Sequence, residues 1–275
     1  MPLIAASLLV WLGWRQTWAV FGLMTLALVV GPALLFVRRS PEDMGLHPDG
    51  GQSSFHPNPS RAMRERARSS ATRPVTDEAV WTRKEAARTL TFWLVVIIFG
   101  ISSVGVTGLN LHVFAYVSDI GHSEVVAATV MSVIALMQLA SPLLWGLLAE
   151  RIDVRDATMI KFLLQAAGLS LATTTSHISL LYAGFLLYGI GLGGGMVLSE
   201  IMWVHYFGRL SLGRVRGLGI LLTQVLAAGG PPFFGFLFDI THSYLLPFSI
   251  FAVLLLISAF LTRALRPPEK PPPAQ

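Results

Sequence analysis

Long apolar runs separated by short polar breaks make up most of the chain. A helix needs about 20 apolar residues to cross the hydrocarbon core of a membrane. Breaks such as residues 118–123 and 176–179 are so short that the helices they join must be antiparallel neighbours. The pattern therefore predicts an all-α fold, a polytopic transmembrane helix bundle. Seven runs meet the length requirement, at residues 18–37, 90–117, 125–149, 157–174, 180–207, 218–238 and 244–264.

Two segments in the first third depart from this pattern. Residues 1–12 are apolar but too short to cross a membrane, and they lack the basic start of a signal peptide. We interpret them as the end of a helix whose beginning is missing, so that the chain is an N-terminally truncated fragment. Residues 45–73 are rich in Gly, Pro, Ser and Arg, which predicts a flexible, solvated linker.

A short helix is expected between this linker and the next span. Thr76 is a favourable N-cap residue, and acidic residues follow it in the first turn. Val80, Trp81, Ala87 and Leu90 then lie roughly on one helical face. The pattern predicts a short helix on the membrane surface, with an ordinary linker turn as the alternative.

Composition and charge agree with a membrane protein. Hydrophobic residues make up 53% of the chain and charged residues 13%, whereas a soluble domain has about 25% charged residues. If the linker is cytoplasmic and the sides alternate, all 20 lysine and arginine residues except Arg15 lie on the cytoplasmic side. This distribution predicts a cytoplasmic C-terminus, and it explains the net charge of +5 without a nucleic-acid partner. The chain has no cysteine, which excludes disulfides and cysteine-ligated metals.

A charged motif stands at the end of the run at residues 125–149. Gly146 is followed by the pair Glu150-Arg151 and then by Arg155. This arrangement is similar to the cytoplasmic loop motif of the major facilitator superfamily, a Gly, an acid-Arg pair and further basic residues. Its place in the chain matches the loop between the eighth and ninth helices of that family. The resemblance implies that these four residues belong to a cytoplasmic gating loop.

Other segments extend the resemblance over nearly the whole chain. Residues 13–15 and 39–46 resemble the flanks of the family's sixth helix, residues 206–217 the loop after its tenth, and residues 229–239 its eleventh. The family's fold consists of two six-helix bundles around a central cavity. The resemblance implies an N-terminal bundle of which residues 1–37 are the end, a cytoplasmic central loop with the surface helix at 38–89, a C-terminal six-helix bundle at 90–266, and a cytoplasmic tail at 267–275.

Residues 112–121 are also similar to the branch of this family that contains monocarboxylate carriers and oxalate–formate exchangers. Those carriers hold a carboxylate with a basic residue in the C-terminal half. We find no lysine or arginine deep inside a predicted span of this chain, and this argues against an anionic substrate.

Two glycine-rich segments lie inside predicted spans. Residues 189–194 match the G-x-G-x-x-G pattern of dinucleotide-binding loops. Because no strand precedes them, we interpret them as small residues that let membrane helices pack closely. The second segment predicts a helix bend, either static or used in transport, because proline removes a helical hydrogen bond. Its residues are Gly229, Gly230, Pro231 and Pro232.

Polar residues inside spans are candidates for the substrate path. Polar groups in lipid need partners, so they usually face the interior of a bundle. Asn110, His112, Gln138 and Gln224 are expected either to bond neighbouring helices or to line the path of a substrate, and Gln165 lies in a further span. His112 is in addition a candidate for proton coupling.

Glu200 is an acid that lies clearly inside a span, about 13 Å of helix from Arg209 at the cytoplasmic edge. An unpaired carboxylate at this depth is costly. We expect an ion pair with Arg151 or Arg155 that acts as a cytoplasmic latch. Proton coupling and snorkelling to the surface are the alternatives.

The resemblance implies secondary active transport of a small solute across the cytoplasmic membrane by alternating access, driven by an ion gradient, with the proton as a candidate coupling ion. No P-loop, nucleophile elbow or H-E-x-x-H motif indicates an enzyme, a cofactor or a metal. The expected partners are the lipid bilayer, a small-molecule substrate and the coupling ion. A non-transporting membrane sensor on the same scaffold is the main alternative, and a membrane-embedded enzyme a more remote one.

Overall fold

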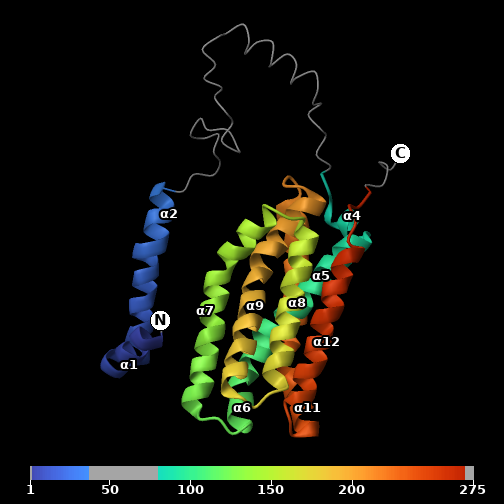
Figure 1. Cartoon of the computed structure of the whole chain (residues 1–275). Helices are drawn as coiled ribbons and strands as arrows, with labels where there is room; N and C mark the ends of the chain where they lie inside the picture. Colours follow the sequence, from blue (N-terminus) through green and yellow to red (C-terminus); the bar gives the residue numbers. More distant parts are fainter. Residues whose placement is uncertain (1, 37–79, 270–275) are drawn as a thin grey trace, which may run out of the picture. The chain divides into compact units, whose positions relative to one another are not determined.

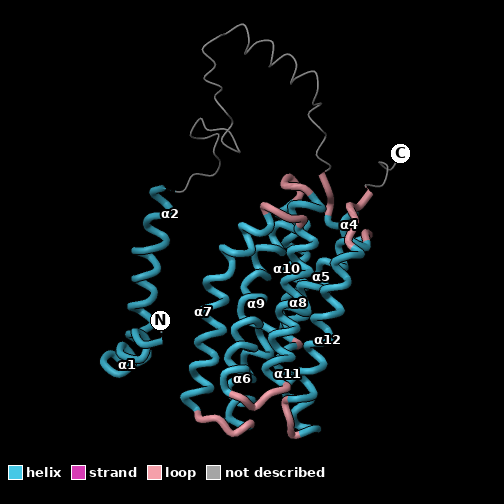
Figure 2. Tube along the Cα trace, in the orientation of Figure 1, coloured by secondary structure: helices cyan, strands magenta, loops and turns pink. Residues whose placement is uncertain are grey.

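The computed structural model describes residues 2–36 and 80–269, which form helices joined by short turns (Figures 1 and 2). No strand occurs within these residues, and the all-α prediction is confirmed. The chain divides into two compact units, Met1–Pro74 and Val75–Gln275. The predicted linker at residues 45–73 and the predicted cap at Thr76 lie outside the described residues.

The first unit contains one bent helical segment. It is made of α1 (Pro2–Thr25), the π-helical turn η1 (Leu26–Val30) and α2 (Gly31–Phe36). Gly13 interrupts α1 with φ 73° and ψ 167°, a conformation that glycine adopts readily and other residues avoid. The bend agrees with the predicted break between a truncated helix and the following span. The stretch Trp11–Leu35 is long and apolar enough to cross a membrane.

The second unit is a bundle of long antiparallel helices (Figure 1). Its elements are α4 (Arg83–Ala87), α5 (Leu90–Val104), η4 (Gly105–Leu109), α6 (Asn110–Asp119), α7 (Glu124–Ala149), α8 (Val154–Thr173), α9 (Ile178–Phe207), α10 (Leu212–Ala228), α11 (Gly230–Thr241), α12 (Leu245–Leu261) and η5 (Thr262–Ala264). Helix α9 packs along α7 and α8, α8 also packs on α12, and α5 packs on α10. Helices α7, α8 and α9, with 26, 20 and 30 residues, are each long enough to cross a hydrocarbon core of about 30 Å.

Six described stretches are long and apolar enough to cross a membrane, five of them in the second unit. They correspond to six of the seven predicted spans. The remaining prediction, at residues 157–174, falls on α8. This helix has 20 residues, but Asp156, Lys161 and Gln165 lower its hydropathy. Its position between α9 and α12 is that of a bundle member, and its crossing of the membrane stays a prediction.

Glycines allow the closest approach of α8 and α9. A Cβ atom at Gly168 would lie 2.4 Å from the Tyr188 amide nitrogen, and one at Gly184 would lie 2.6 Å from the Ala172 amide nitrogen. The glycines of residues 189–194 also let helices pack closely. A Cβ atom at Gly193 would lie 2.8 Å from the Gln138 carbonyl oxygen of α7. The packing interpretation of this run is therefore confirmed. Small residues that let backbones touch are a common means of helix association in membranes.

A buried tryptophan packs at the start of the described part of the second unit. The Trp81 side chain is 3% exposed and packs edge-on against Phe207, with ring centroids 5.6 Å apart. The Trp81 backbone N–H donates a hydrogen bond to Ser211 Oγ at 2.6 Å. Residues 80–82 are not helical, so the described part of the helix predicted from Thr76 onward is shorter than expected. It begins at Arg83, because Thr82 and Glu85 form a capping box that fixes its N-terminus.

Candidate functional site

A lysine lies buried within the second unit. Lys161 belongs to α8 and has 0% exposure. Its Nζ donates a hydrogen bond to Ser102 Oγ of α5 at 2.7 Å, and it lies 3.8 Å from the centroid of the Phe162 ring. The expectation that no basic residue lies deep in the bundle is wrong. Ser102 is 12 residues after the start of α5, about 18 Å of helix, which is near the middle of the hydrocarbon core.

Two more polar side chains are buried beside this lysine. Gln165 follows Lys161 by one helical turn, and Tyr188 of α9 lies next to Gln165. Both side chains are 0% exposed. Within the described residues, the Gln165 amide and the Tyr188 hydroxyl interact with each other and make no further hydrogen bond. We name Ser102, Lys161, Gln165 and Tyr188 the Lys161 cluster, which gathers polar groups from three helices.

The distribution of charge along the chain does not predict the Lys161 cluster. It groups Lys161 with the cytoplasmic charges, because Arg155 and Asp156 precede it closely. The helical period gives a different answer. Lys161 stands four residues after Ala157 and four before Gln165, on the stripe that α8 buries. A basic residue on the apolar stripe of a helix is the sequence signal that identifies the Lys161 cluster.

Glu200 forms an ion pair with a residue other than the predicted ones. Its Oε1 lies 2.5 Å from Nη2 of Arg216 on α10, with side chains 44% and 37% exposed. The predicted pair with Arg151 or Arg155 is therefore wrong. Helix α10 runs back along the end of α9, so Arg216 is the nearer cation. A cavity of about 460 Å³ lies beside this pair and is lined by Glu200, Ile201, Val204, His205 and Leu212.

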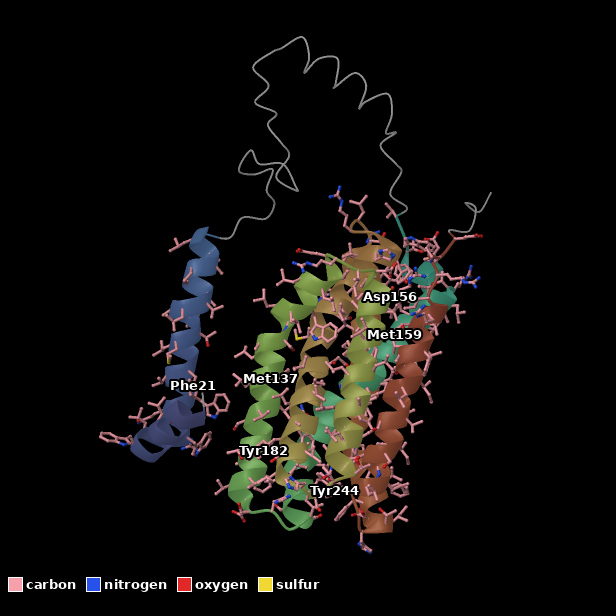
Figure 3. All side chains as sticks on the ribbon, in the orientation of Figure 1. Phe21, Met137, Asp156, Met159, Tyr182 and Tyr244 are labelled. Carbon is pink, nitrogen blue, oxygen red and sulfur yellow. The ribbon has the colours of Figure 1, made fainter. Side chains whose placement is uncertain are left out.

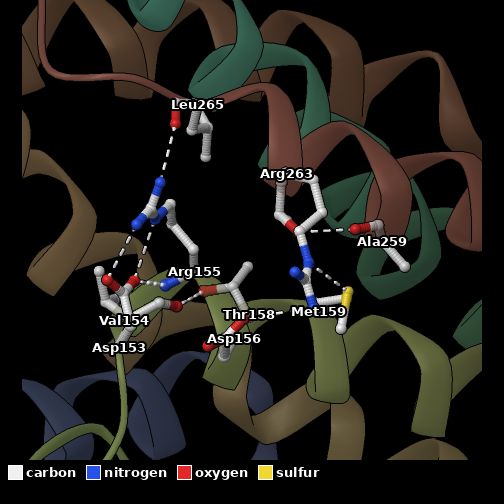
Figure 4. A network of polar contacts seen from close by, with 10 residues as sticks. Asp153, Val154, Arg155, Asp156, Thr158, Met159, Ala259, Arg263 and Leu265 are labelled. Carbon is white, nitrogen blue, oxygen red and sulfur yellow. Dashed lines mark hydrogen bonds and ion pairs between the residues drawn. The ribbon is translucent and has the colours of Figure 1, made fainter.

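The predicted gating loop has its own contacts (Figure 4). Arg155 pairs with Asp153 at 3.1 Å, and its Nη1 donates to the Leu265 carbonyl at 3.4 Å. The hydrogen bonds from Arg155 hold the pKa of Asp153 below its usual value. Arg263 pairs with Asp156 at 3.5 Å. These contacts join the start of α8 to the end of α12.

The rest of the predicted loop motif stays at the surface. Glu150 and Arg151 are exposed at the turn after α7. The Glu150 N–H donates to the Gly146 carbonyl at 3.2 Å, and the Cβ position of Gly146 meets no atom within 4 Å. The gating role of these three residues stays a prediction.

The four substrate-path candidates lie on three helices. Asn110 and His112 are on α6, Gln138 is half-buried on α7, and Gln224 is exposed on α10. His112 Nδ1 lies 3.2 Å from the hydroxyl of Tyr244, at the end of the bundle opposite Asp156 (Figure 3). This contact supports interhelical bonding for His112. The Asn110 Oδ1 atom is buried and has no partner among the described residues.

The predicted bend is present where α10 gives way to α11. Helix α10 ends at Ala228, and α11 begins at Gly230 with Pro231 and Pro232 in its first turn. Pro231 has no N–H for the carbonyl of Ala227, four residues before it. Thr107 Oγ1 of the π-helical turn η4 donates to that carbonyl at 2.5 Å instead. The hydroxyl of a neighbouring helix thus replaces a missing backbone donor.

The two irregular segments also touch through glycines. A Cβ atom at Gly108 would lie 2.6 Å from the Gly230 carbonyl carbon, and one at Gly230 would lie 2.8 Å from the Val104 carbonyl oxygen. Only glycine permits this approach. The bend in α10–α11 and the π-helical turn in α5–α6 are therefore one packed unit.

Comparison with known proteins agrees with this architecture. The family model described as Major Facilitator Superfamily matches residues 1–140 and 103–275, which together cover the whole chain. The chain belongs to the major facilitator superfamily. The resemblance recognised in the sequence is confirmed, and the protein is a membrane transporter in general terms. No match is found among curated proteins.

The Glu200–Arg216 pair of this transporter is open to a double-mutant test. We expect Glu200→Gln and Arg216→Gln each to lower the free energy of unfolding by up to about 1 kcal/mol, because the pair is half exposed. The double variant should have a free energy of unfolding no lower than that of the less stable single variant. Thermal unfolding followed by tryptophan fluorescence measures these values.

Arg151→Gln is the matched control for this cycle, because it removes a cation at the same end of the bundle. Its effect should add to that of Glu200→Gln. Coupling between Glu200 and Arg151, with additivity between Glu200 and Arg216, would contradict the observed pairing.

Proposed function

We propose that the protein is a secondary active transporter that moves a small solute across the cell membrane by alternating access. Family membership and the apolar helices support transport in general. The observation that carries the proposal further is the Lys161 cluster. Its polar groups gather near the middle of an apolar bundle, and polar residues in such places commonly mark the path of a solute or an ion.

The cytoplasmic part of the proposed cycle involves Glu200 and Arg216. This pair joins α9 to α10, and a cavity lined by Glu200 and by residues near the end of α9 lies beside it. We expect the pair to hold the two helices together while the cytoplasmic side is closed, and to separate when it opens. An ion gradient supplies the energy in this proposal, with the proton as the first candidate.

Topology gives a separate prediction. Two single cysteines are easily placed, because the chain has none of its own. Ser179→Cys at the start of α9 should react with a membrane-impermeant maleimide in intact cells, whereas Glu269→Cys after η5 should react only in opened cells. Reaction of both from one side would contradict an odd number of crossings between them and the proposed cytoplasmic C-terminus.

Transport itself is tested in vesicles that contain the purified protein. A proton gradient should drive the uptake of at least one solute from a panel of labelled carboxylates, amines and neutral solutes. Vesicles without the protein are the control, and dissipation of the gradient should abolish uptake. Absence of gradient-dependent flux for every solute, together with a signalling phenotype in cells, would favour a membrane sensor.

A further inference from the structure

The ammonium group of Lys161 has bonding capacity that the protein leaves unused. An ammonium carries three N–H donors. Lys161 Nζ makes one hydrogen bond, to Ser102 Oγ, and one contact with the Phe162 ring. None of the described carboxylates forms an ion pair with it. A buried cation without a counter-charge is costly, and a bound anion would supply that counter-charge.

Ser102 is suited to hold the same anion. Its oxygen accepts the hydrogen bond from Lys161, so its own hydroxyl hydrogen remains available to donate. Ser102 is 4% exposed, and no acidic residue lies on α5. The pair therefore presents two donors, one of them positively charged, and no competing negative group from its own helix. Charge-assisted donors of this kind bind carboxylates and other oxyanions well.

Gly195 of α9 lies directly against this pair. A Cβ atom there would lie 3.6 Å from Ser102 Oγ and 3.9 Å from Lys161 Nζ. Gly195 is itself half-buried, whereas the neighbouring Met196 is 82% exposed. The Lys161 ammonium is thus separated from the exposed side of α9 by a residue that has no side chain.

The other glycines of this run have a different role. Cβ atoms at Gly191, Gly193 and Gly194 would lie within 3 Å of atoms of α7 or α8, so helix packing explains them. The Cβ position of Gly195 meets only the two polar atoms of the pair, at ordinary contact distances. Packing therefore does not account for a glycine at residue 195.

Ser199 follows Gly195 by one turn, so it lies on the same face of α9, and it is half-buried. Glu200 lies about 140° around the helix from Gly195 and one turn after Met196, on the neighbouring face. The cavity beside Glu200 begins five residues from Gly195, about 7.5 Å along the helix. Polar residues in a span usually face protein or water and not lipid. A hydrated route from the Glu200 end to Gly195 fits this arrangement.

We propose that Lys161 Nζ and Ser102 Oγ form a binding site for the anionic group of a small solute, and that Gly195 is the opening through which the solute reaches it. The inference rests on the proposed transport function, for which it names the class of substrate. It also reverses the conclusion that the sequence alone suggested, because Lys161 is the basic residue inside the bundle that was not expected.

The absence of cysteine permits a test that needs neither transport activity nor a known substrate. Ser102→Cys is treated with two thiol reagents of similar size, an anionic sulfonatoethyl and a cationic trimethylammonium-ethyl methanethiosulfonate. Their rate ratio cancels any change in ionisation of the thiol itself. Val106→Cys, one turn along the same helix and 41% exposed, gives the reference ratio.

We expect the anionic reagent to be favoured at Ser102→Cys by about tenfold relative to the reference, because the Lys161 charge attracts it. Adding Lys161→Gln should return the ratio to the reference value, and adding Lys161→Arg should preserve it. Adding Gly195→Val should slow both reagents at Ser102→Cys and leave Val106→Cys unchanged, whereas Gly195→Ala should slow them less. The Gly195 variants keep Lys161 in place, so they stay informative if Lys161→Gln fails to fold.

Two results would overturn the site. One is a ratio at Ser102→Cys that equals the reference while Lys161 is present. The other is no reaction at Ser102→Cys with either reagent while Val106→Cys reacts. A charge-dependent ratio in a protein that transports nothing would instead uphold the anion site and reject the proposed function, so the two failures can be told apart.

Discussion

Replacement of Gly184 by alanine should lower the free energy of unfolding by about 1–3 kcal/mol. The new Cβ atom would lie 2.6 Å from the Ala172 amide nitrogen and 2.7 Å from the Gly168 carbonyl oxygen. Both neighbours are backbone atoms, so the overlap is relieved only if α8 and α9 move apart. Alanine is favoured over glycine in a helix by about 1 kcal/mol, but this gain is smaller than the expected packing loss.

Gly217→Ala is the matched control. It lies within α10, and its Cβ position meets nothing within 4 Å. The same substitution there should be neutral or slightly stabilising, because only the helix propensity changes. Thermal unfolding followed by tryptophan fluorescence distinguishes the two cases. A Gly184→Ala variant as stable as Gly217→Ala would show that the close crossing of α8 and α9 is absent.

The long helices could be predicted from the sequence because lipid leaves few alternatives. Every backbone polar group in a hydrocarbon core needs an internal partner, so an apolar run of sufficient length becomes a helix. The break at Gly13 and the bend before Pro231 could also be predicted, because glycine and proline mark irregular backbone. The short helix at Arg83–Ala87 was misplaced because its start depends on one capping box, and Thr76 and Thr82 are equally good caps by residue type.

The candidate site was harder to predict, because side-chain partners depend on distances between helices. Lys161 was assigned to the surface by its charge, although its spacing places it on the buried stripe. Glu200 was matched with Arg151 or Arg155 on the basis of a shared membrane side. The structure shows that Arg155 is already paired with Asp153, two residues away, and that Arg216 lies nearer to Glu200. Ion pairs between residues close in the sequence should therefore be assigned before ion pairs between residues far apart in it.

The crossing of η4 and α11 connects two features that the sequence shows only one at a time. Pro231 and its neighbours predict a bend, but the sequence of residues 105–109 does not predict a π-helical turn. The two occur together because the freed carbonyl of Ala227 needs a donor, and the hydroxyl of Thr107 reaches it. Irregular backbone in a membrane is tolerated where a neighbour supplies such a group.

Thr107→Val should therefore destabilise the bundle by about 1 kcal/mol, because the partly buried carbonyl of Ala227 loses the hydrogen bond that the hydroxyl donates. Valine has nearly the same shape, so the loss reports on the hydroxyl, and Thr107→Ser should retain most of the stability. Thr223→Val on α10 is the control, because within the described part of the chain the Thr223 hydroxyl donates to the Ile220 carbonyl of its own helix and to no other group. It should change the melting temperature little.

The origin of the effect is tested by restoring the missing donor. Pro231→Ala provides an N–H four residues after Ala227, where a regular helix would place the donor for that carbonyl. In this background Thr107→Val should cost clearly less than in the natural sequence, which a double-mutant cycle of thermal unfolding measures. Equal costs in both backgrounds would mean that Thr107 stabilises the crossing by packing alone. A reduced cost would show that the hydroxyl of one irregular segment and the proline of the other form a single coupled element, because each then matters only in the presence of the other.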